Sequence, residues 1–460
     1  MSATNRTTHD IEWYDVAAQE PFVYSPGDIS WVLSCTALVW IMIPGVGFFY
    51  SGLLRRKNAL NMIYLSMTTF AVVSFQWFLW GYSLTYSDRA NRFIGDLKYF
   101  ALRGVLGNPS IASDRIPAIV HCVYQLMFAA FTPMLALGGF AERCRLGPVA
   151  PFVFVWSTLV YDPIACWIWN KAGWSNFMGA LDYAGGTPVH ISSGSAALAI
   201  AIYLGKRSGY GTDNLKYQPH NTTYVVLGTV FMWFGWFGFN GGSTLSANLR
   251  AAHACIVTNL AASVGGLTWV LWDYYLGKRW SVVAFCSGAL SGLVSITPAA
   301  GYVGAPAALV FGVVAGTLCN FATQLKFLLR YDECLDVFAC HGVGGIVGNL
   351  LTGLFAEASI ARLNASPEAR IFGGWLSHNY VILAHQLADS TAGIAYSFVV
   401  TTLILWIFHF LPFLRLRTNE EAEIVGIDEN DMGELAYDFS TDPERGRDDP
   451  PLSAGTAANH

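Results

Sequence analysis

Long apolar runs separated by short polar segments make up most of this chain. A membrane-crossing helix needs about 20 consecutive apolar residues, and the runs have about this length. Several of them are rich in Gly, Ala, Ser and Thr, which let membrane helices approach closely, so we expect those to lie inside a bundle. The pattern predicts eleven transmembrane helices at about residues 30–54, 60–84, 117–141, 147–169, 186–205, 222–242, 252–276, 281–299, 303–325, 335–355 and 385–412.

The composition supports an integral membrane protein. Hydrophobic residues make up 54% of the chain and charged residues 12%, whereas soluble domains carry about 25% charge. The acidic residues concentrate at the end of the chain, where the segment from Asn419 onward contains 12 acidic and 2 basic residues. We therefore expect an all-α membrane protein with an extracellular segment at 1–28, an eleven-span transporter domain at 29–412 and a cytoplasmic regulatory tail at 413–460, disordered after about 440.

Basic residues beside the predicted helices indicate the orientation. With an odd number of spans, the two ends of the chain lie on opposite sides of the membrane. If the N-terminus is outside, the inner segments hold 14 basic residues and the intervening outer segments hold 9. Because basic residues favour the cytoplasmic side, we expect an extracellular N-terminus and a cytoplasmic C-terminus. The sequons at Asn5 and Asn364 then fall outside and are candidate glycosylation sites.

Two histidines lie within spans expected to be buried in the bilayer. His190 is in the fifth span and His341 is in the tenth. An ionisable side chain at this depth is costly, so it usually faces a pore, a partner or a substrate. The alternative is a pair of core histidines bonded to neighbouring groups. Their positions suggest two inverted five-helix repeats followed by one long extra helix, an arrangement that places binding sites between the repeats.

Other kinds of chemistry lack their usual motifs. No Gly-x-x-x-x-Gly-Lys-Ser/Thr run, His-Glu-x-x-His motif or Gly-x-Ser-x-Gly motif is present. The nine cysteines form no Cys-x-x-Cys pair, so neither a metal site nor a disulfide framework is expected. Charge is too sparse for nucleic-acid binding. We expect no enzyme activity, no metal and no cofactor.

Five stretches together resemble the Amt/Mep/Rh family of ammonium transporters, and most closely its fungal Mep2-type members. They are MIPGVGFFYSG at 42–52, VSFQWF at 73–78, GGTPVHISSG at 185–194, WFGWFGFNGGS at 233–243 and HGVGG at 341–345. The resemblance covers about residues 28–440. It implies the ammonium transporter fold, a homotrimer with one pore in each protomer, a place in the plasma membrane, and ammonium or ammonia as the substrate.

The resemblance also assigns site residues. It implies an outer ammonium site at Trp169, Phe128 and Ser243, with Tyr124 in the vestibule and Trp167 as an alternative to Trp169. Phe128 and Phe239 would form a gate beneath this site. Tyr124 and Phe128 belong to a stripe with His121 and Gln125 on one face of the third span, and an aromatic stripe is more often helix packing than a binding site. Phe239 and Ser243 are four residues apart and share a helix face.

His190 and His341 would be the family's twin pore histidines, and two imidazoles can share a proton while still bonding to a small solute. Gly345 and Gly348 lie on the face of His341 and are expected to leave room beside its ring. Asp182 and Asp336 precede the two histidines and are expected to cap helix N-termini and to support the site. His121 has no assigned role, and we favour a structural one.

The expected function is transport of ammonium and methylammonium. Ammonium would lose its proton at the gate, and ammonia would pass the histidines, with or without proton co-transfer. Two alternatives stay open: a receptor that signals nitrogen limitation, and a neutral gas channel of the Rh kind. A kinase or signalling partner would bind the tail, where Ser440 and Ser453 are candidate phosphorylation sites.

Overall fold

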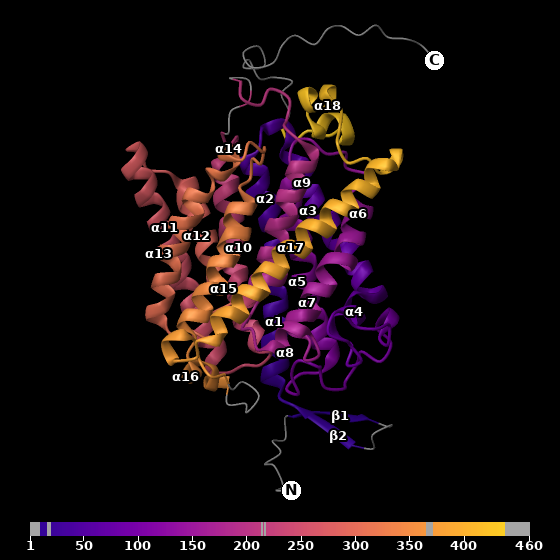
Figure 1. The fold of residues 1–460 in the computed structure, drawn as a ribbon. Coiled ribbons are helices and arrows are strands. Elements are labelled where there is room, and N and C mark those ends of the chain that lie inside the picture. Colours follow the sequence, from indigo (N-terminus) through magenta and orange to yellow (C-terminus); the bar gives the residue numbers. More distant parts are fainter. Residues whose placement is uncertain (1–9, 16–19, 213–214, 216–217, 365–370, 438–460) are drawn as a thin grey trace.

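The computed structural model describes residues 10–15, 20–212, 215, 218–364 and 371–437 as a bundle of helices (Figure 1). In this part of the chain, ten helical segments are long and apolar enough to cross a membrane. They are Pro26–Leu53, Arg56–Tyr86, Ala118–Phe140, Val149–Met178, Gly186–Leu204, Thr222–Thr244, Leu249–Gly277, Ala305–Leu328, Phe338–Phe355 and Val381–Phe410. Nine of these segments match predicted spans to within four residues at each end, and the tenth, Val149–Met178, runs nine residues past its predicted end because it includes the short helix α8 (Trp174–Met178).

The remaining predicted span, at 281–299, is the apolar helix α12 (Val282–Ile296). Its 15 residues rise about 22 Å, which is shorter than the hydrocarbon core of a bilayer. It packs very closely on α11 (Leu249–Gly277), because a Cβ atom on Gly292 would lie 2.2 Å from the Ala261 carbonyl oxygen. The count of eleven crossings therefore stays a prediction, with α12 as the helix in question.

Both histidine-bearing spans begin with a π-helical turn. The turn η6 (Gly186–Ile191) leads into α9 (Ser192–Leu204), and η8 (Phe338–Val343) leads into α15 (Gly344–Phe355). Each histidine lies within its π turn. Because π turns rotate the following side chains relative to a regular helix and occur often at functional sites, both histidines are held by non-standard local geometry.

The last long helix, α17 (Val381–Phe410), crosses the bundle obliquely (Figure 1). It has 30 residues and spans about 45 Å, more than a bilayer core requires, so an oblique path is expected. Its side chains reach the segment that carries Asp182, as described below. This helix corresponds to the long extra helix predicted after the two repeats.

One element departs from the all-α prediction. Strands β1 (Ile11–Asp15) and β2 (Glu20–Tyr24) form an antiparallel hairpin before α1 (Pro26–Trp40). The Trp13 Nε1 atom donates to Asn108 and the Tyr24 hydroxyl donates to the Gly107 carbonyl, so the hairpin packs on the loop before α5 (Ala118–Ala136). Strands this short give a weak signal beside the long apolar runs. The hairpin and the tail helix α18 (Glu420–Val425) lie at opposite ends of the bundle (Figure 1).

Candidate functional site

A cavity of about 340 Å³ opens among the loops and helix ends that carry Trp169, Asp182 and Ser243. We call it the vestibule cavity. Trp169 ends α7 (Asp162–Trp169) and is half-buried, and its Nε1 atom donates to the Asp182 carbonyl at 3.3 Å. Trp167 instead donates to the Phe93 carbonyl and packs on Tyr396. Of the two tryptophans considered from the sequence, Trp169 is the one that lines this cavity.

The Ser243 hydroxyl lines the vestibule cavity and leaves an acceptor available, whereas Tyr124, expected in the vestibule, is 0% exposed and does not line the cavity. The Ser243 hydroxyl, just after α10 (Thr222–Gly241), donates to the Phe239 carbonyl at 2.8 Å. The Tyr124 hydroxyl lies 2.9 Å from the same carbonyl and 3.3 Å from Ser243 Oγ. With its proton directed to the backbone, the half-buried Ser243 oxygen presents lone pairs to a donor in the cavity.

Aromatic rings close the cavity beneath Trp169. The Phe128 ring meets Trp169 edge-on, with centroids 5.7 Å apart, and lies 4.2 Å from the Phe239 ring. Phe128 and Phe239 are 1% and 0% exposed, and neither lines the vestibule cavity. The two rings pack against each other beneath the cavity, and their assignment as a gate stays a prediction.

The two histidines lie together behind the phenylalanines. The Nδ1 atoms of His190 and His341 are 3.2 Å apart, and their rings meet edge to edge with centroids 5.3 Å apart and planes inclined by 26°. The His190 ring also stacks on Trp236, 5.5 Å away, and it lies 6.2 Å from Phe239. The pair is thus bonded ring to ring, and Trp236, which the sequence reasoning missed, covers one face of His190.

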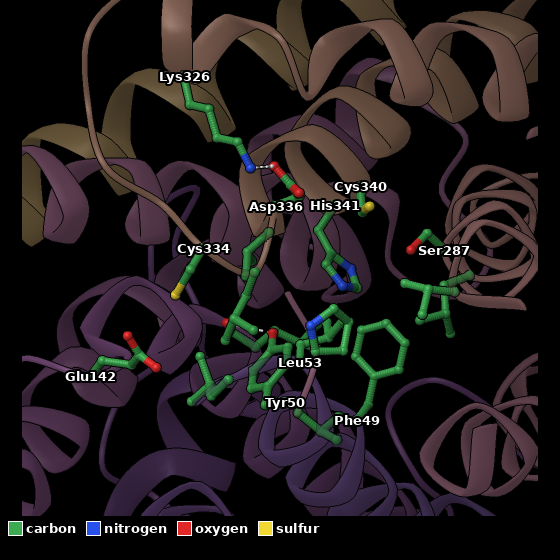
Figure 2. Close-up of a pocket in the computed structure, with 18 of the residues that line it drawn as sticks. Phe49, Tyr50, Leu53, Glu142, Ser287, Lys326, Cys334, Asp336, Cys340 and His341 are labelled. Atoms are coloured by element: carbon green, nitrogen blue, oxygen red, sulfur yellow. Dashed lines mark hydrogen bonds and ion pairs between the residues drawn. The ribbon is translucent and has the colours of Figure 1, made fainter. Parts of the chain in front are cut away.

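A second cavity, of about 170 Å³, reaches His341 from the other side (Figure 2). We call it the histidine cavity. Phe49 and Tyr50 of α2 (Met42–Leu53) line it, and the Tyr50 hydroxyl donates to the Leu135 carbonyl at 3.0 Å. His341 lines this cavity but His190 does not. The two cavities are therefore separated by a packed layer of Phe128, Phe239 and His190.

Asp182 organises the start of the first histidine span. Its carboxylate accepts hydrogen bonds from the backbone N–H groups of Gly185, Gly186 and Thr187 at 2.7–2.8 Å. Burial raises the pKa of this carboxyl, and the three amides partly offset that rise. Its geometry is that of a helix cap, and it leaves little bonding capacity for a ligand.

Residues of α17 support the same segment, and the sequence reasoning did not single them out. Asp389 accepts hydrogen bonds from the hydroxyls of Thr187 and Ser175, and Gln386 bonds both the N–H and the C=O of Leu181. These contacts attach the loop between Leu181 and Thr187 to α17. The long helix therefore helps to position Asp182 and, through it, the turn that carries His190.

Asp336 has a different partner from the one expected. Its carboxylate pairs with Lys326 at 2.7 Å beside the histidine cavity (Figure 2), and its backbone has a positive φ of 52°. The carboxylate that bonds a backbone N–H at the start of η8 is Glu333, which accepts from Phe338 at 3.0 Å. The expected capping role thus lies three residues earlier, because the left-handed backbone at Asp336 directs its side chain away from the turn.

The glycines after the histidines make room for backbone rather than for imidazole. A Cβ on Gly345 would lie 2.9 Å from the Gly186 carbonyl oxygen and 3.2 Å from the Ile191 nitrogen, and one on Gly194 would lie 2.2 Å from the Gly342 nitrogen. In each span, the glycine four residues after the histidine contacts the residue that follows the other histidine. This reciprocal contact is the pattern that two equivalent halves related by a two-fold axis would produce, and it supports the proposal of an inverted repeat.

The other residues singled out in the sequence lie as follows. His121 is buried, with its Nδ1 atom 3.4 Å from the Tyr82 hydroxyl, and it lines the vestibule cavity. Asn364 is half-buried there and accepts a hydrogen bond from the Asn248 amide, so its use as a glycosylation site stays a prediction. Asn5, Ser440 and Ser453 lie outside the described residues. In the described part, no group of His, Cys, Asp and Glu is arranged to hold a metal ion.

A buried ion network lies at the edge of the histidine cavity. Glu142 accepts from Arg207 at 2.6 Å and from Arg55 at 2.8 Å, and Arg207 also pairs with Asp332 at 2.9 Å. Arg143 donates to the Asp332 carbonyl at 2.6 Å. In the sequence, these arginines served only as orientation signals, because their carboxylate partners lie 65 to 189 residues away.

The Glu142 network gives a pH-dependent prediction. Burial would raise the pKa of Glu142, but Arg207 and Arg55 outweigh it and lower the pKa from 4.5 to about 2. A lowered folded-state pKa means that the stabilisation is complete above pH 4.5 and is lost as the pH falls toward 2. We expect Glu142→Gln to destabilise the protein by about 3 kcal/mol at pH 7, with a difference that shrinks below pH 4.5. Thermal unfolding of the detergent-solubilised protein across this pH range measures it.

The matched control is Asp88→Asn, which breaks the exposed ion pair between Asp88 and Lys98. We expect its effect to stay below about 1 kcal/mol. Equal effects of the two variants at pH 7, or an undiminished Glu142→Gln effect at pH 3, would contradict the assigned network.

The described part of the tail packs on the same end of the bundle. The Asp428 carboxylate accepts from the N–H groups of Leu60 and Asn61, both at 2.8 Å, in the first turn of α3 (Ala59–Gln76). The Tyr437 hydroxyl lies 3.1 Å from His220 Nε2. The tail thus contacts the first turn of α3 and the segment before α10.

Comparisons with known proteins agree with this architecture. Residues 30–437 match the model of the "Ammonium Transporter Family". Ammonium transporter 1 of Schizosaccharomyces pombe is 53% identical, over 91% of this chain and 84% of its own. Ammonium transporter MEP2 of Saccharomyces cerevisiae is 49% identical, over 90% and 84%. The crystal structure of Candida albicans Mep2 superposes with a TM-score of 0.83 at 48% identity, covering 92% of this chain and 93% of that one. The chain is a multi-pass membrane protein that belongs to the ammonium transporter family.

Proposed function

We propose that this protein carries ammonium across the membrane, from the vestibule cavity to the histidine cavity. The observation that supports this proposal most is a continuous row of ring contacts between the two cavities. It runs from Trp169 through Phe128 and Phe239 to the histidine pair. The protein's relatives are named as ammonium transporters. This row of rings therefore lies between the two cavities, where a selective transport path would pass.

Recruitment begins at Trp169 and Ser243. Aromatic faces attract a cation, and the attraction grows as the cation loses water. Ammonium and potassium differ in that ammonium donates hydrogen bonds. The Ser243 oxygen, whose own proton is directed to the Phe239 carbonyl, accepts one of them. Hydrogen bonding at this position thus favours ammonium over potassium.

Passage of the gate requires loss of the charge. The 4.2 Å separation of the Phe128 and Phe239 rings leaves no continuous opening, and the layer beneath them is buried and largely apolar. An ion pushed into such a layer loses its hydration at great cost, whereas neutral ammonia does not. We infer that ammonium releases its proton above the gate and that ammonia moves through when the rings part.

The histidine pair receives ammonia beneath the gate. Two nitrogens 3.2 Å apart share one proton, so one Nδ1 donates and the other accepts. His190 Nε2 is buried without a partner among the described residues, which leaves a position for a small polar solute or for a proton that follows it. This arrangement supports proton co-transfer with ammonia as a further part of the proposal.

The proposal also includes the membrane, the assembly and the orientation of the protein. We place the protein in the plasma membrane as a homotrimer, with the vestibule cavity outside and the tail inside. The position of the hairpin and α18 at opposite ends of the bundle supports the placement of the two ends of the chain on opposite sides of the membrane (Figure 1). The excess of basic residues beside the predicted inner helix ends supports the orientation.

Uptake of radiolabelled methylammonium tests the function directly. Cells that lack their own ammonium transporters should gain saturable uptake with this protein, and ammonium should inhibit it while potassium should not. Absence of uptake, with the protein shown at the cell surface, would contradict the proposal and favour the receptor alternative. Saturable uptake without any ammonium-dependent current would favour the neutral gas channel.

Ser243→Ala tests the recruitment step. A hydrogen bond to a charged group contributes about 1.5–3 kcal/mol, so we expect the KM for methylammonium to rise about tenfold or more with little change in the maximal rate. Ser263→Ala is the control, because that hydroxyl bonds within α11 to the Asn259 carbonyl. An unchanged KM in Ser243→Ala would remove this serine from the site.

A further inference from the structure

An arginine side chain is buried in the wall of the vestibule cavity, and no described residue supplies it with a charged partner. Arg250, in the first turn of α11, is 6% exposed and lines this cavity. Its Nε atom donates to the Gly301 carbonyl at 2.7 Å. Its Nη2 atom is buried and has no hydrogen-bond partner in the part of the chain that the structure describes. A buried cation without a partner is costly, so this one requires an explanation.

The neighbours of Arg250 hold its position and leave its charge unneutralised. The guanidinium carbon lies 5.0 Å from the centre of the Tyr183 ring and 4.8 Å from that of Tyr302. These contacts cover the guanidinium with aromatic surface. Asp182 is next to Tyr183 in the chain, but its carboxylate is already occupied by three backbone amides. The start of a helix also disfavours a cation, since its backbone dipole is positive there.

Charged side chains of both signs line the vestibule cavity. Among its described lining residues, the basic ones are Arg115, Lys171 and Arg250, and the acidic ones are Asp114 and Asp182. Arg115 has a carboxylate partner in Asp28, whereas Arg250 has none among the described residues. An anion bound at Arg250 would neutralise its charge and would bond the free edge of the guanidinium. At about 340 Å³ the cavity has room for an ion with several waters.

We infer that the vestibule cavity binds a small monovalent anion, chloride or bicarbonate, at Arg250 beside the proposed ammonium site. The inference rests on the proposed transport function. The guanidinium supplies the charge and N–H donors, and the two tyrosine rings fix its orientation. With the anion bound, the vestibule attracts ammonium. Without it, the uncompensated charge of Arg250 opposes ammonium, so the two ions bind cooperatively.

The first experiment measures methylammonium uptake by intact cells at constant pH and ionic strength, in sodium chloride, in sodium gluconate, and in gluconate with added bicarbonate. We expect the KM in gluconate to be at least threefold higher than in chloride, with an unchanged maximal rate. Restoration by bicarbonate would make the site a general monovalent anion site, and failure to restore would assign it to chloride. Equal KM values in all three media would overturn the inference while leaving the transport function intact.

The variant Arg250→Met keeps the stem of the side chain and removes its charge. We expect its KM to be the same in chloride and gluconate, and lower in gluconate than that of the wild type. Arg115→Met is the matched control, because Arg115 lines the same cavity but lies 3.9 Å from the Asp28 carboxylate. It should keep the wild-type dependence on chloride. Persistence of that dependence in Arg250→Met would also overturn the inference.

A binding measurement on the wild type needs no variant. Chloride titrated into the purified, detergent-solubilised full chain at constant ionic strength should raise the unfolding midpoint with saturation. A midpoint that is the same in chloride and gluconate would contradict a bound anion. Because this readout does not depend on uptake, failure of the anion site and failure of the transport function are distinguishable.

Discussion

Replacement of His190 by alanine is expected to reduce the ratio of ammonium current to potassium current by at least about tenfold, or ~1.4 kcal/mol. The His190 ring is 0% exposed, with Trp236 parallel to it and His341 at its Nδ1 edge, so its removal leaves a void beside the polar edge of His341. A polar void of this size takes up water. Hydrated ions then have a path that the intact layer denies them. Currents recorded in ammonium and in potassium measure the ratio.

Two further variants separate a pore role from a packing role. His190→Leu refills the space without a polar atom, so we expect neither ammonium uptake nor a potassium current. His253→Ala removes a histidine of α11 whose Nε2 atom lies 3.0 Å from the Val303 carbonyl. The current ratio of this variant should equal that of the wild type. An unchanged ratio in His190→Ala would refute the role given to this ring.

Loss of the Asp182 carboxylate should have the largest effect on stability. Asp182→Ala leaves three buried N–H groups, those of Gly185, Gly186 and Thr187, without their acceptor. Each unsatisfied group costs about 1–3 kcal/mol, so we expect a loss of about 3 kcal/mol or more. Thermal unfolding of the solubilised protein and uptake per molecule at the surface are the measurements.

Asp182→Asn keeps one acceptor oxygen and should lie between the wild type and the alanine variant in stability. If the carboxylate acts by positioning, the asparagine variant should retain much of its uptake per folded molecule. Asp114→Ala is the control, since Asp114 is an exposed carboxylate on the same cavity. Its unfolding midpoint should stay near that of the wild type. If Asp182→Asn and Asp182→Ala lowered the unfolding midpoint equally, the negative charge of Asp182, rather than its three hydrogen bonds, would be what stabilises the protein.

The main site residues were accessible to sequence reasoning for two different reasons. His190 and His341 are ionisable groups within apolar runs, and their cost at membrane depth marks them without any structure. Phe128, Phe239, Trp169 and Ser243 lie among many aromatic and small residues, and only the family resemblance singled them out. Trp236 had no distinguishing signal, because it is one of several aromatic residues on α10.

Some residues were missed although the signal was present. Asp162 and Asp389 are also ionisable groups within predicted spans, and the rule that marked the histidines applies to them. Both are buried: Asp162 accepts from Gln76 at 2.7 Å, and Asp389 supports the loop of Asp182. Arg250 lies two residues before the predicted span at 252–276, so the same rule does not mark it, and only the structure shows that it is buried in the wall of the vestibule cavity.

The sequence by itself determined the class of the protein and the approximate positions of its helices, and it singled out the two histidines. These properties depend on hydropathy and on the cost of burying single groups, which act along the chain. Only the tertiary structure decided which groups are partners: that the histidines meet through their Nδ1 atoms, that Glu333 rather than Asp336 bonds the second histidine turn, and that the glycines accommodate backbone. The reason is that these contacts join segments of two separate spans. His190 and His341 are 151 residues apart, and a one-dimensional pattern does not contain the packing angles that bring them together.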